Sequence, residues 1–223
     1  VLLKVNTTEQ YTTASPVPHT EIIVGQWSIA LGKTYSREEV HQSLGIISAT
    51  NRIWGKAIQT DAKISPANYG GPLIDIQGRV YGILTPLSPR GQNPTDGTDW
   101  YDSGIGFAVP LIDILPHLDT LKAGKDLHSG LLGVSLKSGD IYDLPAEIVA
   151  VQPKSPARTG GLQKGDTIIK VNDVLISRQA QLRHALGSQY AGNTIAISVK
   201  RDDQVVTTKV TLVEKLEPYE HPL

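Results

Sequence analysis

ISPANYGGPLIDIQGRVYGILTPL, residues 64–87, is the stretch that decides the fold. The segments on either side of Gln77 and Gly78 are rich in aliphatic, β-branched and aromatic residues, which are typical of strands, and the Gln-Gly pair is a turn signal. The sequence therefore predicts a β-hairpin with strands near 73–76 and 80–83, entered through a Gly-Gly-Pro turn at 70–72.

A family resemblance is carried by a longer segment, IQTDAKISPANYGGPLIDIQGRVYGI, residues 58–83. It resembles the nucleophile segment of the HtrA (DegP-type) trypsin-like serine proteases, in which the turn reads Gly-Asn-Ser-Gly-Gly. The five matching residues here are Ala67, Asn68, Tyr69, Gly70 and Gly71. The resemblance implies a trypsin-like second β-barrel in which a tyrosine stands at the nucleophile position.

Tyr69 and Ala67 both alter the catalytic parts that this resemblance implies. Serine works at such a position because its small hydroxyl gives its proton to a histidine as it attacks a carbonyl, while backbone N–H groups stabilise the oxyanion. A phenol oxygen lies much farther from the backbone. Ala67 stands where the family has an oxyanion-hole glycine, and alanine adopts fewer backbone conformations than glycine. We therefore expect no functional catalytic residue in this chain.

Composition narrows the function classes. The chain has 223 residues, 39% of them hydrophobic, which allows one large core or two of about 100 residues, and we expect two. The formal net charge is −1 with both signs scattered, so the sequence predicts no nucleic-acid partner. No apolar run is long enough for membrane insertion. The absence of cysteine excludes disulfides and thiol catalysis.

Residues 1–19 are expected to hold the last strand of a first barrel, VLLKV at 1–5, followed by a proline-containing linker. The resemblance places the histidine and aspartate of a catalytic triad before this segment. Because the chain begins with Val1, inside an expected strand, and contains no methionine, we expect it to be part of a longer protein.

Residues 20–124 are expected to form the second β-barrel and its closing helix. Strands are predicted at 21–32, 43–50 and 105–110, with Gly25, Gly32 and Gly45 at strand breaks. A polar loop is predicted at 88–104. From Pro110 the leucines and isoleucines fall at helical spacing, with a kink expected at Pro116 and an end at Gly124.

Residues 125–214 are expected to form a second β-rich unit with two short helices, and 215–223 a linker or tail. Ser155 is predicted to cap the first helix and Ser177 the second. The unit resembles a PDZ domain of the HtrA type over nearly its whole length. The run SPARTGGLQKGD, residues 155–166, is the most specific element of this resemblance. The predicted fold is therefore mostly β, a trypsin-like second barrel followed by a PDZ domain.

A PDZ domain binds a peptide as an added strand, and its Leu-Gly loop presents backbone N–H groups to the C-terminal carboxylate. The resemblance implies that the loop and the strand after it consist of Leu131, Leu132, Gly133, Val134, Ser135 and Leu136. The apolar face of the second helix, which would line the pocket for the last side chain, carries Leu182, Ala185 and Leu186. The expected partners are therefore peptides or protein C-termini, with no cofactor.

Other candidate groups have weaker support. None of the six histidines lies at ligand spacing with another, so no metal site is predicted. Ser65 and Thr85 lie near the altered turn, yet neither occupies the position that the family uses for attack. Lys63 falls where trypsin-like enzymes place the floor of the specificity pocket. A buried lysine there would need a carboxylate partner, so we expect Lys63 to point outward and the pocket to be filled.

Three functions remain open. The first is a periplasmic or secreted HtrA-like homologue that has lost proteolysis and kept peptide binding, in extracytoplasmic protein quality control or assembly. The second is an active serine endopeptidase whose histidine and aspartate precede Val1 and in which another group replaces serine. The third is a structural protein whose barrel serves a homo-oligomer. The sequence before Val1 would test the second, and light scattering the third.

Overall fold

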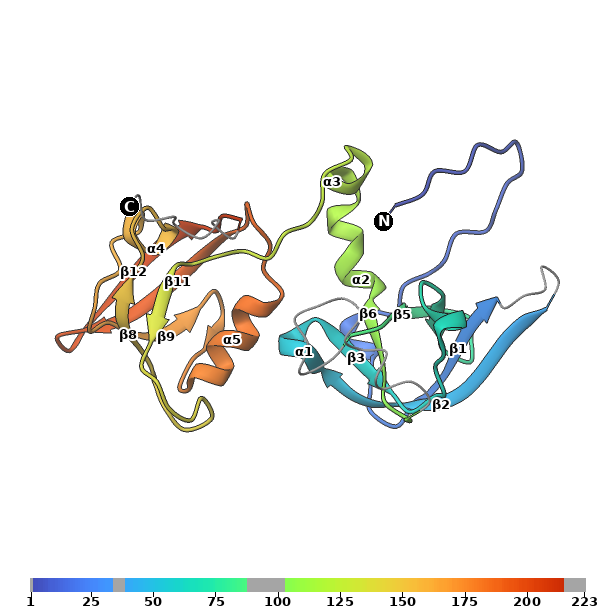
Figure 1. Ribbon diagram of the computed structural model, residues 1–223, viewed down its shortest axis with the longest axis horizontal. Coiled ribbons are helices and arrows are strands. Elements are labelled where there is room, and N and C mark those ends of the chain that lie inside the picture. The colour runs from blue at the N-terminus through green and yellow to red at the C-terminus, as the bar shows by residue number, and fades with distance from the viewer. Residues whose placement is uncertain (1, 34–38, 88–102, 215–223) are drawn as a thin grey trace, which may run out of the picture. The chain divides into compact units, whose positions relative to one another are not determined.

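A computed structural model of the protein describes residues 2–33, 39–87 and 103–214. The chain divides into two units, Val1–Lys125 and Asp126–Leu223, and each is described by itself (Figure 1). Within the described ranges, no helix is long and apolar enough to cross a membrane. The predicted mostly β fold is confirmed, since a six-stranded barrel precedes a β-rich unit with short helices.

The first unit is a closed antiparallel barrel with the strand order β1-β2-β3-β6-β5-β4. Its strands are β1 Trp27–Lys33, β2 Val40–Asn51, β3 Ala57–Thr60, β4 Pro72–Ile74, β5 Val80–Thr85 and β6 Gly106–Pro110. Short helical turns at η1 His19–Glu21, α1 Arg52–Gly55 and η2 Pro66–Asn68 connect them. Alternate strand residues such as Ala30, Ile47, Leu73, Leu84 and Ala108 fill the interior.

The predicted central hairpin is confirmed. Strands β4 and β5 pair antiparallel, with Leu73 opposite Gly82, and Gly78 adopts φ +81° in the turn. The buried Asp75 carboxylate closes this turn, because it accepts hydrogen bonds from the backbone N–H groups of Gln77 and Arg79, each at 2.8 Å. The Arg79 side chain adds a bond to Asp75 at 2.7 Å.

The strand predicted at 1–5 is not formed here, and its assignment to a first barrel stays a prediction, because the resemblance places the other strands of that barrel before Val1. Residues 2–5 form no strand, and Leu3 and Val5 are 82% and 72% exposed. An isolated strand leaves its backbone groups unpaired, and within the described ranges no strand pairs with this one. By contrast Val17, in the predicted linker, is fully buried in the barrel core, and its N–H donates to Val80 O at 2.9 Å.

The predicted strand at 21–32 begins later than expected. Residues 19–21 form η1, and β1 starts at Trp27. Gly32 and Gly45 lie within strands and not at breaks. Glycine is needed at both positions because other parts of the chain pass so close that a side chain would not fit. A Cβ at Gly32 would lie 2.3 Å from Ala67 O, and one at Gly45 would lie 2.3 Å from Ala62 N.

The predicted closing helix is confirmed in three short parts, α2 Leu111–Ile114, η4 Leu115–His117 and α3 Leu118–Lys122. Pro116 lies in the 3₁₀ turn between the two α-helical parts, as a proline that interrupts helical hydrogen bonding should. Gly124 follows the last turn with φ +72°. Most of the predicted loop at 88–104 lies outside the described residues.

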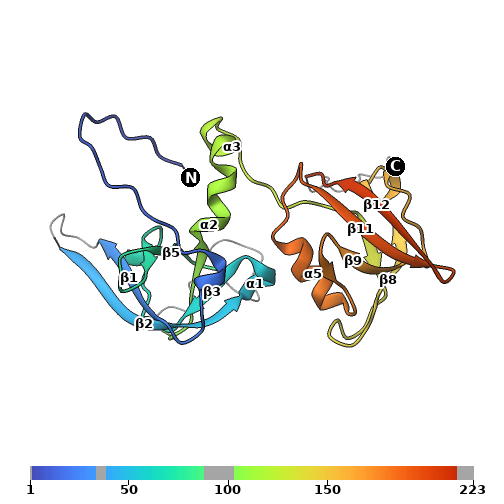
Figure 2. The same cartoon turned by 180° about the vertical axis from the view of Figure 1, so that it is seen from behind.

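The second unit is a sheet with the order β12-β11-β9-β8-β7, and β10 pairs with β9. Its strands are β7 Val134–Leu136, β8 Ala146–Val151, β9 Thr167–Val171, β10 Val174–Leu175, β11 Thr194–Arg201 and β12 Gln204–Thr211. Its helices are α4 Pro156–Thr159 and α5 Gln179–Gly187, and α5 packs against β9 (Figures 1 and 2). The predicted Ser155 cap is confirmed, whereas the cap of α5 is Arg178, one residue after Ser177.

Asp166 and Arg201 form an ion pair within the second unit. The Asp166 carboxylate is 1% exposed and accepts two hydrogen bonds from the Arg201 guanidinium, at 2.7 and 2.8 Å. The same guanidinium donates to Gly161 O at 2.8 Å. The hydrogen bond from Arg201 is the main reason why the pKa of Asp166 lies below its ordinary value.

Candidate functional site

The turn that carries Tyr69 is a short 3₁₀ helix, η2, closed by its own side chains. Ser65 precedes η2 as its cap, and Asn68 Oδ1 accepts hydrogen bonds from Ser65 N at 3.0 Å and Ser65 Oγ at 3.1 Å. These contacts engage the Ser65 hydroxyl within the turn. The geometry therefore argues against Ser65 as a substitute nucleophile.

The backbone N–H groups of this turn point inward to partners within it. Ala67 N donates to Ser65 Oγ at 3.3 Å, and Tyr69 N donates to Pro66 O at 3.3 Å. An oxyanion hole of the trypsin type uses the N–H of the nucleophile and that of the residue two positions before it. At positions 67 and 69 both donors already have acceptors inside the turn.

The barrel fixes the turn in place through close backbone contacts. Gly70 N donates to Leu84 O at 2.9 Å, and Leu84 N donates to Gly71 O at 2.9 Å. A Cβ at Gly71 would lie 2.3 Å from Leu31 O. The turn therefore packs closely against β1 and is hydrogen-bonded to β5.

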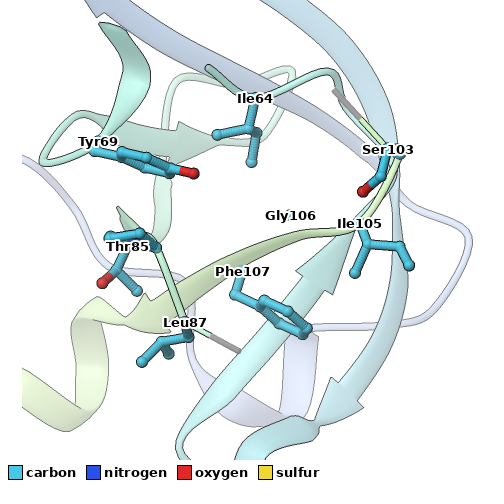
Figure 3. A pocket seen from close by; sticks show the side chains of 10 residues that line it. Ile64, Tyr69, Thr85, Leu87, Ser103, Ile105, Gly106 and Phe107 are labelled. Atoms are coloured by element: carbon cyan, nitrogen blue, oxygen red, sulfur yellow. The ribbon is translucent and has the colours of Figure 1, made fainter. Parts of the chain in front are cut away.

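The ring of Tyr69 lines a pocket of the barrel that is open to solvent (Figure 3). The ring packs partly buried against the barrel core, and this burial raises the pKa of the phenol. This raised pKa opposes loss of the phenol proton. A neutral phenol is a poor nucleophile.

The expectation that Lys63 points outward is confirmed, because its side chain is exposed. The next residue, Ile64, is 6% exposed and turns into the pocket instead. A Cβ at Gly106 would lie 2.1 Å from Ile64 Cδ1, so Ile64 occupies the space that glycine leaves open. An apolar side chain therefore fills the floor that the resemblance assigns to residue 63.

The second candidate site is the loop before β7, which is held by its carbonyl groups. Leu132 O accepts from Ala157 N at 2.9 Å, and Gly133 O accepts from Gln152 N at 2.9 Å. Gly133 has φ +82°, which favours glycine. These contacts fix the position of the loop through its carbonyl groups.

The N–H groups of Leu132 and Gly133 have no backbone acceptor within the described ranges. Gln152 N donates to Gly133 O and Lys137 N to Glu147 O, which sets the hydrogen-bonding register of β7 against β8. Because the inward and outward groups alternate along an antiparallel strand, the N–H and C=O of Val134 face away from β8. Successive backbone N–H groups that converge on one point can bind an anion, and such a role for residues 132–134 stays a prediction.

Strand β7 is the edge of its sheet in the part of the chain that the structure describes. By the same alternation, Leu136 also directs its N–H and C=O outward, and Ser135 bonds to β8. An unpaired edge can accept an extended peptide as a further strand. The loop that is predicted to receive a carboxylate therefore continues directly into an unpaired sheet edge.

The structure places the predicted peptide-binding residues unequally. Leu131 is half-buried, Ser135 is exposed, and Val134 and Leu136 pack partly buried against the core. Three others belong to the core itself, namely Leu132, Leu182 and Ala185, which are 4%, 2% and 9% exposed. Leu186 packs against the same core. Their contact with a peptide stays a prediction, and a free apolar face at Leu182 and Ala185 is not what the structure shows.

Two positioning residues were not predicted from sequence for this site. The buried Gln179 donates from Nε2 to Lys137 O at 2.7 Å, which ties the start of α5 to the end of β7. Ser155 Oγ donates to Gln152 O at 2.7 Å, and its Cβ lies against Gly133. Ser155 was predicted only as a helix cap. The sequence signal that could have identified Gln179 is its position three residues before Leu182, which places a polar side chain on the apolar face of the helix.

Comparisons with known proteins give two domain families. The PDZ domain family matches residues 130–212, and the trypsin-like peptidase domain family matches residues 1–83. The chain is 31% identical over 209 residues to a probable periplasmic serine endoprotease DegP-like of Chlamydia muridarum, covering 87% of this chain and 40% of that protein. It is 29% identical over 237 residues to the serine protease Do-like HtrA of Lactococcus lactis subsp. cremoris, covering 95% and 57%.

Solved structures of serine proteases are also similar to this chain. The chain is similar to the HtrA-type protease AlgW with tripeptide, with 27% identity and a TM-score of 0.64, over 92% of this chain and 70% of that one. It is also similar to the serine endoprotease from Yersinia pestis, with 26% identity and a TM-score of 0.54, over 90% and 64%. The chain spans 40% and 57% of the length of the two curated relatives named above.

Proposed function

Because the chain belongs to the HtrA/DegP type of trypsin-like serine proteases with a PDZ domain, we propose that it is a non-proteolytic homologue that binds peptides or protein C-termini. The single observation that carries the loss of proteolysis is the position of Tyr69. Its ring packs in the barrel pocket, and the N–H groups at 67 and 69 are bonded within the turn.

Chemistry supports this loss at three points. The phenol is bulkier than a serine hydroxyl, and its raised pKa opposes ionisation. The two N–H donors that would stabilise an oxyanion have acceptors inside η2. Removing even one oxyanion donor from an active protease costs about 100-fold or more in kcat. Loss of the nucleophile and of both donors together leaves no route to acyl transfer at this turn.

The loop at Leu132–Val134 supports peptide binding. Its N–H groups at Leu132 and Gly133, which have no backbone acceptor within the described ranges, suit a carboxylate, and the edge of β7 that continues from the loop suits an extended backbone. The named HtrA-type structures that match this chain include ones with a tripeptide or a decapeptide. We assign a peptide ligand to this chain as well, and the loop before β7 favours one with a free C-terminus.

A location outside the cytoplasm fits the relatives, several of which are named periplasmic serine endoproteases. Recognition of free C-termini without cleavage suits a role in extracytoplasmic protein quality control or assembly. We expect no cofactor in this role, since the addition of a peptide strand through backbone hydrogen bonds needs none.

A fluorophosphonate probe tests the proposal against an active endopeptidase. The chain is incubated with the probe beside an active HtrA-type protease, and the mass of each is measured. The chain should gain no adduct, because no activated hydroxyl occupies the turn. Stoichiometric labelling of the chain at any serine or threonine of residues 64–87 would establish the endopeptidase alternative.

An assembly role for the barrel is the second candidate function. Trp27 on β1 and Leu44 on β2 are 55% and 61% exposed, although both are large apolar residues on adjacent strands. Light scattering measures whether the chain in solution has the mass of one copy. A monomer at micromolar concentration would exclude this alternative for the chain.

A further inference from the structure

The sheet edge at β7 ends in a charged residue. Residues 130–136, the loop and the strand after it, carry no charged side chain, and Lys137 follows them directly. The N–H of Lys137 donates to Glu147 O at 3.1 Å, so the pairing with β8 continues one residue beyond β7. Its carbonyl accepts from Gln179 Nε2 at 2.7 Å. Hydrogen bonds on both sides therefore fix the backbone from which the lysine side chain extends.

The Lys137 side chain lies on the solvent face of the sheet. Side chains alternate along a strand. Because Leu136 packs against the core, Lys137 shares the opposite face with the exposed Ser135. The Lys137 side chain is 57% exposed, and its Nζ lies 3.7 Å from Glu147 Oε2. An exposed ion pair of this length contributes little, so a further anionic partner can still approach the ammonium group.

The direction of an added peptide decides which of its residues faces Lys137, and this step rests on the proposed function. The C-terminal carboxylate would lie at the loop before β7, so the peptide runs antiparallel to β7. Val134 directs its N–H and C=O away from β8, which places the last peptide residue opposite Val134. The third residue from the C-terminus then lies opposite Leu136, and the fourth lies opposite Lys137.

A side chain at the fourth place from the C-terminus would be a close neighbour of Lys137. Residues directly opposite in an antiparallel pair share one face and have Cβ atoms about 5 Å apart. Glu147 belongs to β8, which is one strand spacing, about 4.8 Å, farther from the peptide. Because the Coulomb energy falls with distance, the lysine affects a charge at this place more strongly than Glu147 does.

We propose that Lys137 is a specificity-determining residue, which favours peptides with an acidic side chain at the fourth place from a free C-terminus. The side-chain carboxylate at that place forms an ion pair with the Lys137 ammonium group across the added strand. A lysine or arginine at the same place is disfavoured, because it brings a like charge to Lys137. The terminal carboxylate binds separately, at the loop before β7.

Titration of the whole chain with matched peptides tests this proposal. The hexapeptides end in valine with a free carboxylate and differ only at the fourth place from the end, which is glutamate, glutamine or lysine. The glutamate peptide should bind roughly two- to fivefold more tightly than the glutamine peptide, as expected for an opposite-charge pair across strands. The lysine peptide should bind more weakly than either. About 0.5 M NaCl should reduce these differences, because salt screens exposed charges.

Three variants test whether Lys137 is the residue responsible. Lys137→Gln should bind the glutamate and glutamine peptides equally, and Lys137→Glu should prefer the lysine peptide. Lys209→Glu is the matched control, since it makes the same change in charge at an exposed residue of β12, which lies at the other end of the strand order. This control should keep the native order of affinities.

The outcomes separate this inference from the function on which it rests. Equal affinity of the native chain for all three peptides would overturn the role of Lys137 and leave C-terminal peptide binding intact. A preference for glutamate that persists in Lys137→Gln would also overturn that role. Binding of no peptide by a chain that melts cooperatively would overturn the proposed function, and this inference with it.

Discussion

Gly133 lies so close to Ser155 that a Cβ on the glycine would be 2.2 Å from the Cβ of Ser155. The same glycine has φ +82°. Ser155 in turn donates from Oγ to Gln152 O at 2.7 Å and caps α4. The loop proposed to bind a carboxylate is therefore set by one glycine that packs directly on a helix cap.

Replacing Gly133 by alanine should disrupt this loop. The left-handed backbone alone costs about 1–2 kcal/mol for a residue with a Cβ, and the overlap with Ser155 adds to it. Gly165→Ala is a matched control, since Gly165 has φ +92° and no atom within 4 Å of an added Cβ. Urea unfolding should show a larger loss for Gly133→Ala than for Gly165→Ala. Equal losses would mean that the contact with Ser155 does not matter.

The stability of the second unit should fall in acid because of Asp166. Its pKa in the folded state lies below the ordinary value of 3.8, chiefly through the hydrogen bond from Arg201. A lowered folded pKa gives stability that is present above the unfolded pKa and is lost as pH falls through the folded one. The loss should therefore begin below about pH 5 and continue as the pH falls below the ordinary value.

Hydrogen exchange measured by mass spectrometry can follow this loss in peptides from residues 126–214. Asp166→Asn should be less protected than the native chain at pH 7, and the difference should shrink as the pH approaches 3. Comparison of both proteins at each pH cancels the intrinsic dependence of exchange on pH. A difference that stays constant down to pH 3 would show that the Asp166 carboxylate is not the group responsible.

Restoring serine at position 69 should not restore hydrolysis. The N–H of Ala67 and that of residue 69 are bonded inside η2, so the oxyanion would lack its donors. Tyr69→Ser and the double variant Tyr69→Ser, Ala67→Gly are assayed with an unfolded fluorescent casein. Neither should exceed the background of the native chain. Turnover by Tyr69→Ser alone would contradict the account of the turn.

Gln179 should matter for both stability and peptide binding. Its amide joins α5 to Lys137 at the end of β7, and loss of such a bond costs about 1 kcal/mol. Gln179→Ala should therefore unfold at lower urea and bind a C-terminal peptide more weakly. Gln163→Ala, at an exposed residue of the same unit, is the control. Unchanged peptide affinity in Gln179→Ala would show that α5 needs no anchor to β7.

Local sequence signals were sufficient for much of the fold. The Gln77 and Gly78 turn, the cap at Ser155 and the kink at Pro116 were predicted correctly, because each depends on neighbours along the chain. Gly32 and Gly45 were misplaced at strand breaks. Both glycines lack a side chain where the segment near Ala62–Ala67 packs against the strands, and this contact joins distant parts of the sequence.

The candidate site was only partly predictable, because part of it also depends on contacts between distant parts of the sequence. Residue identity at positions 67 and 69 indicated the loss of chemistry, but the inward bonds of their N–H groups and the entry of Ile64 into the pocket depend on tertiary structure. Helical spacing grouped Leu182 with Ala185 correctly. It does not tell whether such a face meets the core or a ligand, and here it meets the core.

The burial of Leu182 also determines how the groove is tested. A charge at a residue that is 2% exposed would damage the fold before it affected any ligand. Changes to the peptide avoid this difficulty, because they leave the protein intact. A peptide that ends in an apolar residue can carry a free C-terminal carboxylate or an amide, and the two forms differ only at the group that the loop would bind.

Isothermal titration of the chain with these two peptides tests the central claim most directly. The free carboxylate should bind with a Kd on the order of micromolar, about −8 kcal/mol. The amide should bind at least tenfold more weakly, because it removes the charge that the N–H groups of Leu132, Gly133 and Val134 would receive. Equal affinity for the two forms, or no binding of either, would contradict the assignment of this chain as a C-terminal peptide binder.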